Sequence, residues 1–145
     1  MRAGWRLAVT LTPTAHRWLT VSGELDRLRG LTDLPVRADS RLPSEPRPHP
    51  DPERFLFAPA SANSVAKLAL GVADNQALTV LCEALGNGLS MVVATQVNGG
   101  HGGHPAWPGH LATLRAAGVE VLPLWPELPW TSAVDAVGSA TNRPT

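Results

Sequence analysis

One stretch of the sequence, RFLFAPASANSVAKLALGVAD at residues 54–74, restricts the fold more than any other. Its residues 55–58 form a short apolar run typical of a strand, and Pro59 predicts a turn after it. From about Asn63 the apolar residues recur at the spacing of a helix face. Only small and hydrogen-bonding residues separate the two elements. This order predicts an open α/β sheet with a site for a phosphate or a planar cofactor at the carboxyl end of the strand.

The rest of the chain alternates between strand-like and helix-like segments. Residues 90–94 are rich in β-branched residues and apolar on both faces, which is typical of a covered parallel strand. The alternation predicts an α/β fold, a three-layer Rossmann-like (flavodoxin-like) parallel sheet with helices on both faces. The other strands are expected at residues 5–11 and 119–122, with a short extended piece at 34–38. The other helices are expected at residues 15–19, 22–28, 77–85 and 105–117, with one turn near 132–137.

Capping residues and prolines predict where segments begin and end. Thr12 can cap a helix that has Pro13 at its first position. Ser22 is expected to cap the next helix, and Gly30 to end it. Residues 41–52 contain five prolines in twelve positions, so we expect an extended, exposed loop there.

The composition limits the class of protein. A chain of 145 residues suffices for one ordinary domain, expected at residues 1–122, followed by a Pro- and Trp-rich tail at residues 123–145. Because 12 basic residues balance 12 acidic ones, there is no electrostatic case for nucleic acid or an anionic membrane as partner. No signal peptide and no apolar run of membrane-spanning length is visible, so we expect a cytoplasmic protein.

Cysteine and histidine offer little for a metal site. The single cysteine, Cys82, lies in an apolar helical pattern, which favours an inert buried thiol over a reactive one. His101 and His104 lie three positions apart in QVNGGHGGH, and two such histidines could bind a metal on one helix face. The four glycines disfavour a helix, and no third ligand is near. We therefore expect no metal, and we expect His104 with Pro105 to begin the next helix.

One string after the strand at residues 55–58 carries a resemblance to a known family. Its residues are Pro59, Ala60, Ser61, Ala62, Asn63 and Ser64, followed by Lys67, Gly71 and Asp74. Together they resemble the PASANT motif of the homo-oligomeric flavin-containing cysteine decarboxylases, and the similarity extends over about residues 5–122. The resemblance implies an FMN-dependent lyase that oxidatively decarboxylates a small-molecule or peptidyl cysteine substrate. It also implies a homo-oligomer, a trimer or a multiple of it. Relatives that transfer prenyl groups to flavin share the fold, but they fit the motif less well.

The same resemblance implies roles for individual residues at the cofactor. The flavin is expected to contact Pro59, Ala60, Ser61, Ala62 and Asn63, with Thr12 and Thr14 near its phosphate. Asn98 stands where the family carries a P-x-M-N motif and would contact the substrate carboxylate, since an amide both donates and accepts. The alternative for Asn98 is an ordinary Asn-Gly turn.

A catalytic base is implied as well. His49 is the only histidine in the region where the family places its base, upstream of the strand that leads to PASANT. A histidine with a pKa near neutral would suit that task. The alternative is a solvated loop histidine, because prolines flank His49 on both sides.

Two departures from the family pattern leave a second function open. The P-x-M-N motif is reduced to TQVN at residues 95–98, in which only the Asn survives. The family begins with a strand and a G-x-(S/T)-G loop that holds the flavin phosphate, whereas residues 1–5, MRAGW, match the end of the family's first helix. The alternative function is a non-catalytic or truncated family member that acts as a partner subunit or flavin-binding protein.

Overall fold

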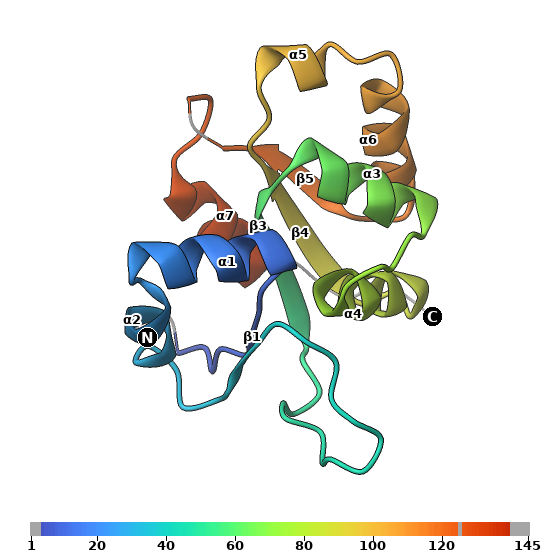
Figure 1. The fold of residues 1–145 in the computed structure, drawn as a ribbon. Helices are drawn as coiled ribbons and strands as arrows, with labels where there is room; N and C mark the ends of the chain where they lie inside the picture. Colours follow the sequence, from blue (N-terminus) through green and yellow to red (C-terminus); the bar gives the residue numbers. More distant parts are fainter. Residues whose placement is uncertain (1–3, 125, 140–145) are drawn as a thin grey trace. The chain divides into compact units, whose positions relative to one another are not determined.

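The computed structural model describes residues 4–124 and 126–139. The chain divides into two units, each described by itself below. The first comprises Met1–Pro52 and Asp74–Thr79, and the second Glu53–Ala73 and Val80–Thr145. Helix α4 (Gln76–Gly86) therefore begins in the first unit and continues in the second (Figure 1).

The described part of the first unit contains two very short strands, two complete helices and the start of α4. β1 (Val9–Thr10) pairs in parallel with β2 (Val36–Arg37). A strand was expected over residues 5–11, but only Val9 and Thr10 form one, so its predicted length is wrong. Its partner β2 offers only two pairing residues. β2 itself lies within the extended piece expected at residues 34–38. α1 (Pro13–Ser22) begins as predicted, since Thr12 Oγ1 accepts a hydrogen bond from the backbone N–H of Ala15 at 3.2 Å.

The prediction that Ser22 caps the second helix is wrong. Ser22 is the last residue of α1, and Gly23 ends that helix in the left-handed conformation with φ of 78°. A glycine adopts this conformation without a steric penalty. Gly23 therefore ends α1 directly after Ser22, and Ser22 does not cap α2. α2 (Leu25–Arg29) begins after Glu24, and Gly30 ends it as predicted.

The proline-rich residues 41–52 form a loop without helix or strand, as expected. Local polar contacts fasten it. Arg47 pairs with Asp51 at 2.9 Å, and Arg41 donates to the backbone carbonyl of Glu45 at 2.8 Å. The proline content therefore predicts this region correctly, because proline can neither donate to a ladder nor continue a helix.

The second unit is built on a three-stranded parallel sheet in the order β3-β4-β5. Its strands are β3 (Arg54–Ala60), β4 (Ser90–Thr95) and β5 (Glu120–Pro123). Every residue of β4 is buried, as the apolar run predicted for a strand covered on both faces. The expected parallel α/β architecture is confirmed in this unit.

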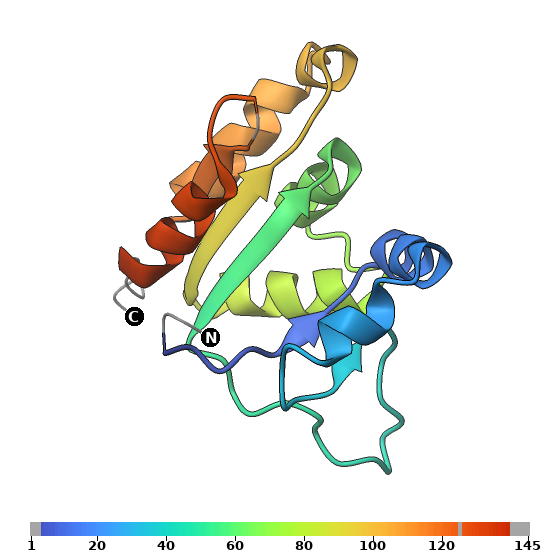
Figure 2. The same ribbon diagram turned by 90° about the vertical axis from the view of Figure 1, so that its left-hand side faces the viewer.

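Helices cover both faces of this sheet. α3 (Ala62–Leu70) and α6 (Trp107–Ala116) contact each other on one face, and α7 (Trp130–Ser139) packs on β3 and β4 from the other (Figures 1 and 2). Ala133 of α7 forms a core cluster with Ala94 and Leu124, and Ala58 packs onto this cluster. α7 is ten residues long, where the sequence predicted a single turn. No helix in the described part of the chain is long and apolar enough to cross a membrane.

Candidate functional site

The junction between β3 and α3 forms one half of the candidate site. Ser61 follows the strand in extended conformation and caps α3, its Oγ accepting from the N–H of Ser64 at 3.2 Å. The N–H of Val65 donates to the carbonyl of Ser61 at 2.9 Å. Helix geometry then leaves the N–H groups of Ala62 and Asn63 without intrahelical acceptors. These two donors, together with the helix dipole, favour an anion or an electron-rich edge of a ligand.

Pro59 does not form the turn predicted for it. It lies inside β3, next to Ala60, where the pairing register with β4 shifts between Phe57 and Ala60. The Ala58–Pro59 peptide bond is cis. An irregular stretch of pairing tolerates a proline, which has no N–H to donate. The chain therefore turns two residues later, at Ser61.

The carboxyl end of β4 forms the other half. Asn98 is extended and caps α5 (Gly99–Gly102), its Oδ1 accepting from the N–H of His101 at 2.9 Å. The glycines were expected to disfavour a helix here, and the structure nevertheless forms one, although it is a single turn. A capping asparagine supplies an acceptor that offsets part of the low helix propensity of glycine.

The two halves lie at the same edge of the sheet because β3 and β4 are parallel neighbours. Ala60 pairs with Thr95, and the N–H of Gln96 donates to the carbonyl of Ala60 at 3.0 Å. Both views show α5 and the start of α3 beyond the carboxyl ends of these strands (Figures 1 and 2). The structure thus brings together Asn98 and the predicted residues Pro59, Ala60, Ser61, Ala62 and Asn63.

Thr95 is a residue of this edge that the sequence analysis missed. Its side chain is buried, and its Oγ1 donates to the carbonyl of Leu122 at 3.3 Å. Its own carbonyl accepts from the N–H of Leu124 at 2.8 Å. Thr95 thereby joins the ends of β4 and β5 just before Asn98. A threonine that closes an otherwise apolar strand was the available signal.

Three predicted site residues, Thr12, Thr14 and His49, belong to the first unit. Thr12 caps α1, and Thr14 is exposed in its first turn. The Nε2 of His49 lies 2.6 Å from the carbonyl of Pro35. Because a carbonyl only accepts, Nε2 carries the proton, and His49 fastens the proline-rich loop. Only Nδ1 of His49 is left to accept a proton.

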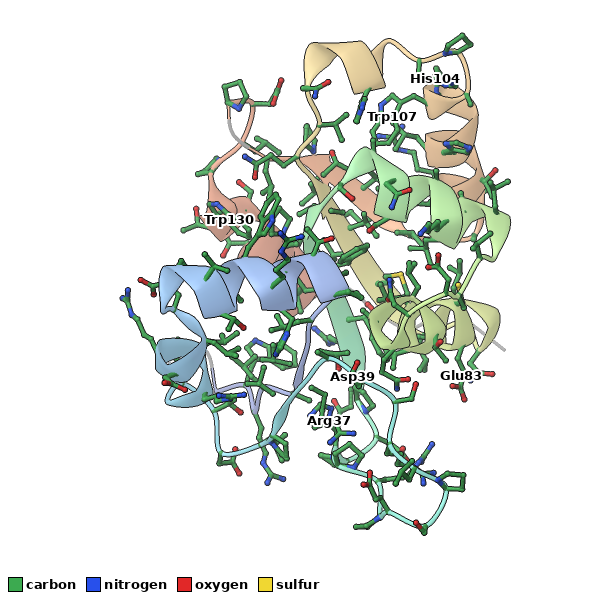
Figure 3. All side chains as sticks on the ribbon, in the orientation of Figure 1. Arg37, Asp39, Glu83, His104, Trp107 and Trp130 are labelled. Carbon is green, nitrogen blue, oxygen red and sulfur yellow. The ribbon has the colours of Figure 1, made fainter. Side chains whose placement is uncertain are left out.

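His104, which follows α5, makes local hydrogen bonds with the backbone that leads into α6. His104 Nδ1 accepts from the N–H of Ala106 at 3.0 Å, and its carbonyl accepts from the N–H of Trp107 at 2.9 Å. Figure 3 shows His104 and Trp107 near the start of α6. Within residues 4–124 and 126–139, no three His, Cys, Asp or Glu side chains are grouped as a metal would require. His104 lies in the turn before α6, which begins at Trp107, two residues later than the start expected at residue 105.

Cys82 is half-buried in α4. Burial raises the pKa of its thiol, because the low-dielectric surroundings disfavour the thiolate. The thiolate is the nucleophilic form, so this environment agrees with the prediction of an unreactive cysteine.

Comparison with known proteins defines the class to which this fold and this edge belong. The flavoprotein family model matches residues 6–141, so the chain belongs to the flavoprotein family. Compared with curated proteins, the sequence matches none.

Three solved structures have a similar fold. The FMN-dependent cysteine decarboxylase TvaF from thioviridamide biosynthesis is 25% identical, with a TM-score of 0.68 over 93% of this chain and 82% of that one. The cypemycin decarboxylase CypD is 26% identical, with a TM-score of 0.64 over 89% of this chain and 72% of that one. The FMN-dependent cysteine decarboxylase SpaF is 17% identical and supports the fold alone, with a TM-score of 0.61 over 94% of this chain and 97% of that one.

Proposed function

We propose that this flavoprotein binds FMN and oxidatively decarboxylates a cysteine-containing substrate, as a flavin-dependent lyase. The observation that carries the proposal is the shared sheet edge, where the capped start of α3 and the side chain of Asn98 follow neighbouring strands. The likeness to TvaF and CypD supports the same activity.

The residues at the start of α3 fit a flavin. The backbone N–H groups of Ala62 and Asn63 are donors without intrahelical acceptors, which suits a phosphate or a ring carbonyl. Ala60, Ser61 and Ala62 are small, so the backbone can be approached closely. When bound, the flavin supplies the two-electron oxidant that the protein's own side chains lack. The polypeptide contributes binding and orientation.

Asn98 is proposed to hold the substrate carboxylate. Its Oδ1 is occupied by the N–H of His101, so its NH2 group is the end left to donate. A carboxylate accepts such hydrogen bonds and would be held beside the start of α3. Fixing the carboxylate orients the bond that breaks when CO2 leaves.

The roles of the first-unit residues are proposals of the same kind. Thr12 and Thr14 would assist with the flavin phosphate, and His49 would act as the base through Nδ1. The hydrogen bond from His49 to Pro35 fixes the ring but leaves that nitrogen as an acceptor.

We also propose a homo-oligomer, a trimer or a multiple of it. α1 buries none of its residues, and Trp18 and Val21 on this helix are 70% and 83% exposed. Apolar side chains exposed on one helix suit a subunit contact.

The second candidate function is a flavin-binding or partner subunit without decarboxylase activity. The hydrogen bond from His49 to Pro35 favours it, since one ring nitrogen of the predicted base is already engaged. In that case FMN would still bind at the edge of the second unit.

Mass spectrometry of a peptide ending in a free cysteine tests the activity. After incubation with the protein and FMN, we expect loss of CO2 and two hydrogens from the peptide. Asn98→Ala should lower the rate at least about tenfold, the effect of one lost hydrogen bond to a charged group. Asn87→Ala, which lies before β4 at the opposite end of the sheet, is the matched control and should leave the rate unchanged. An unchanged peptide would contradict the decarboxylase proposal.

A further inference from the structure

The helix α5 is short and buries none of its residues. Three of its four residues are glycine, and residues 98–105 are all exposed. A glycine disfavours a helix more than any residue except proline. A one-turn helix with this composition and no buried side chain has little to stabilise it beyond its cap.

Neither steric fit nor backbone conformation explains these glycines. None of Gly99, Gly100, Gly102 and Gly103 has a positive φ. A Cβ at Gly99 or Gly102 would meet nothing within 4 Å, and one at Gly100 only Asn98 Oδ1 at 3.5 Å. Gly103 alone is restricted, since its Cβ would lie 3.1 Å from the carbonyl oxygen of Gly99. The glycines instead lower the stability of α5, so that this helix opens easily.

The same helix controls the orientation of Asn98. When α5 is folded, the N–H of His101 donates to Asn98 Oδ1, and the N–H of Gly102 donates to the Asn98 carbonyl at 2.9 Å. The first bond requires the oxygen of the carboxamide to face the helix, which directs its NH2 group elsewhere as a donor. When α5 opens, that bond is lost and the carboxamide can rotate.

We propose that α5 is a folding switch in the native protein: it interconverts between coil and helix, and its helical form sets the Asn98 carboxamide as a carboxylate donor. The coupling to a carboxylate rests on the proposed function, whereas the helix–coil exchange does not. A ligand that requires the helical form binds with an affinity reduced by the fraction of time that α5 is folded. Substitutions that stabilise α5 should therefore tighten binding.

Amide hydrogen exchange measured by NMR tests the switch in the protein alone. The N–H of Gly103 donates to the carbonyl of Gly99 at 2.9 Å only when α5 is folded, so it reports on the helix. We expect its protection to be below roughly twofold, which corresponds to a helix folded at most about half of the time and is far less than the protection of the buried β4 residues Val92 and Val93. The double variant Gly99→Ala/Gly102→Ala should raise this protection at least about fivefold. Protection of the wild-type Gly103 N–H equal to that of β4 would overturn the proposal.

Peptide affinity tests the coupling. With FMN present, the double variant should bind a peptide ending in a free cysteine at least about twofold more tightly than the wild type, and the C-terminal amide of that peptide no more tightly. Gly109→Ala is the matched control, because it fills open space in α6 and should change neither result.

The outcomes separate the two proposals. An unchanged affinity in a double variant whose Gly103 protection has risen overturns the coupling while the proposed function stands. If no form of the protein binds the peptide, the proposed substrate class and the coupling both fail, and the exchange data still decide whether α5 opens. FMN binding is read separately, from its absorbance.

Discussion

Arg54, the first residue of β3, donates from Nη1 to the carbonyl of Val137 at 2.7 Å, near the end of α7. The same nitrogen donates to the carbonyl of Gly138 at 2.9 Å. The last carbonyls of a helix lack intrahelical donors and lie at the negative end of its dipole, so a guanidinium there is doubly favourable. Arg54 therefore fastens α7 to the sheet on which it packs.

Replacing Arg54 should destabilise the second unit. Arg54→Met keeps most of the aliphatic stem but removes both hydrogen bonds, and we expect the free energy of unfolding in urea to fall by about 1–2 kcal/mol. Arg115→Met, at an exposed position in the last turn of α6, serves as control and should change it by less than about 0.5 kcal/mol. Equal effects of the two variants would show that the contact with α7 contributes nothing.

Ser61 allows helix capping to be separated from ligand binding. Ser61→Ala removes the acceptor for the Ser64 N–H and should cost about 1 kcal/mol of stability. Ser61→Asp keeps a capping oxygen, so the stability should be retained. Its negative charge should nevertheless weaken FMN binding at the start of α3 by about tenfold or more, equivalent to at least about 1.4 kcal/mol. Stability and FMN titrations of both variants check this, and unweakened binding by Ser61→Asp would place the anionic part of FMN elsewhere.

The thiol of Cys82 should react slowly. Because burial raises its pKa, the thiolate fraction at neutral pH is smaller than for a free cysteine. A disulfide reagent should therefore label the folded protein more slowly than the urea-unfolded chain, and the folded-state rate should keep rising above the ordinary cysteine pKa of about 8.5. Equal labelling rates in both states would contradict the assignment.

The ion pair between Arg6 and Asp33 should stabilise the first unit in a pH-dependent way. Arg6 Nη2 lies 2.7 Å from Asp33 Oδ2, and hydrogen bonding from this guanidinium holds the pKa of the Asp33 carboxyl below its usual value. A carboxyl with a lowered folded-state pKa contributes stability above its unfolded-state pKa of about 4, and that contribution is lost as the pH falls through the folded-state value. Both side chains are exposed, so the effect should be small and sensitive to salt.

Asp33→Asn tests this sign. Its melting temperature should lie below that of the wild type at pH 7, and the two should converge as the pH falls below about 4. A difference that grew with acidification would mean that Asp33 is not stabilised as the carboxylate.

The sequence predicted those parts of the fold that local patterns determine. The buried strand β4 follows from its β-branched apolar run, and the loop at residues 41–52 follows from its prolines. Ser61, Ala62 and Asn63 could be placed at the start of a helix because small capping residues follow an apolar strand. Asn98 was singled out by the resemblance to the family's P-x-M-N motif, and only the parallel pairing of β3 and β4 shows that it follows the strand next to β3.

The parts that the sequence did not predict depend on competition between neighbours or on distant contacts. Ser22 is a good capping residue, but Gly23 beside it ends a helix more strongly. Pro59 looked like a turn because the register shift that accommodates it involves β4. Arg54 bonds to the carbonyl of Val137 near the end of α7, and the two residues are 83 positions apart in the sequence. No local pattern reveals a contact over that separation.

The measurement that tests the central claim most directly is FMN binding by gel filtration with visible absorbance, on the wild type, Asn63→Ala and Asn87→Ala. We expect flavin to co-elute with the wild type and with Asn87→Ala. Asn63→Ala keeps the backbone N–H but removes the exposed side-chain carboxamide, which we expect to make one hydrogen bond to the flavin. This variant should bind FMN about tenfold more weakly, equivalent to about 1.4 kcal/mol. Flavin that co-eluted equally with all three would contradict a contact between the Asn63 side chain and the cofactor, and no flavin on the wild type would contradict FMN binding by this chain.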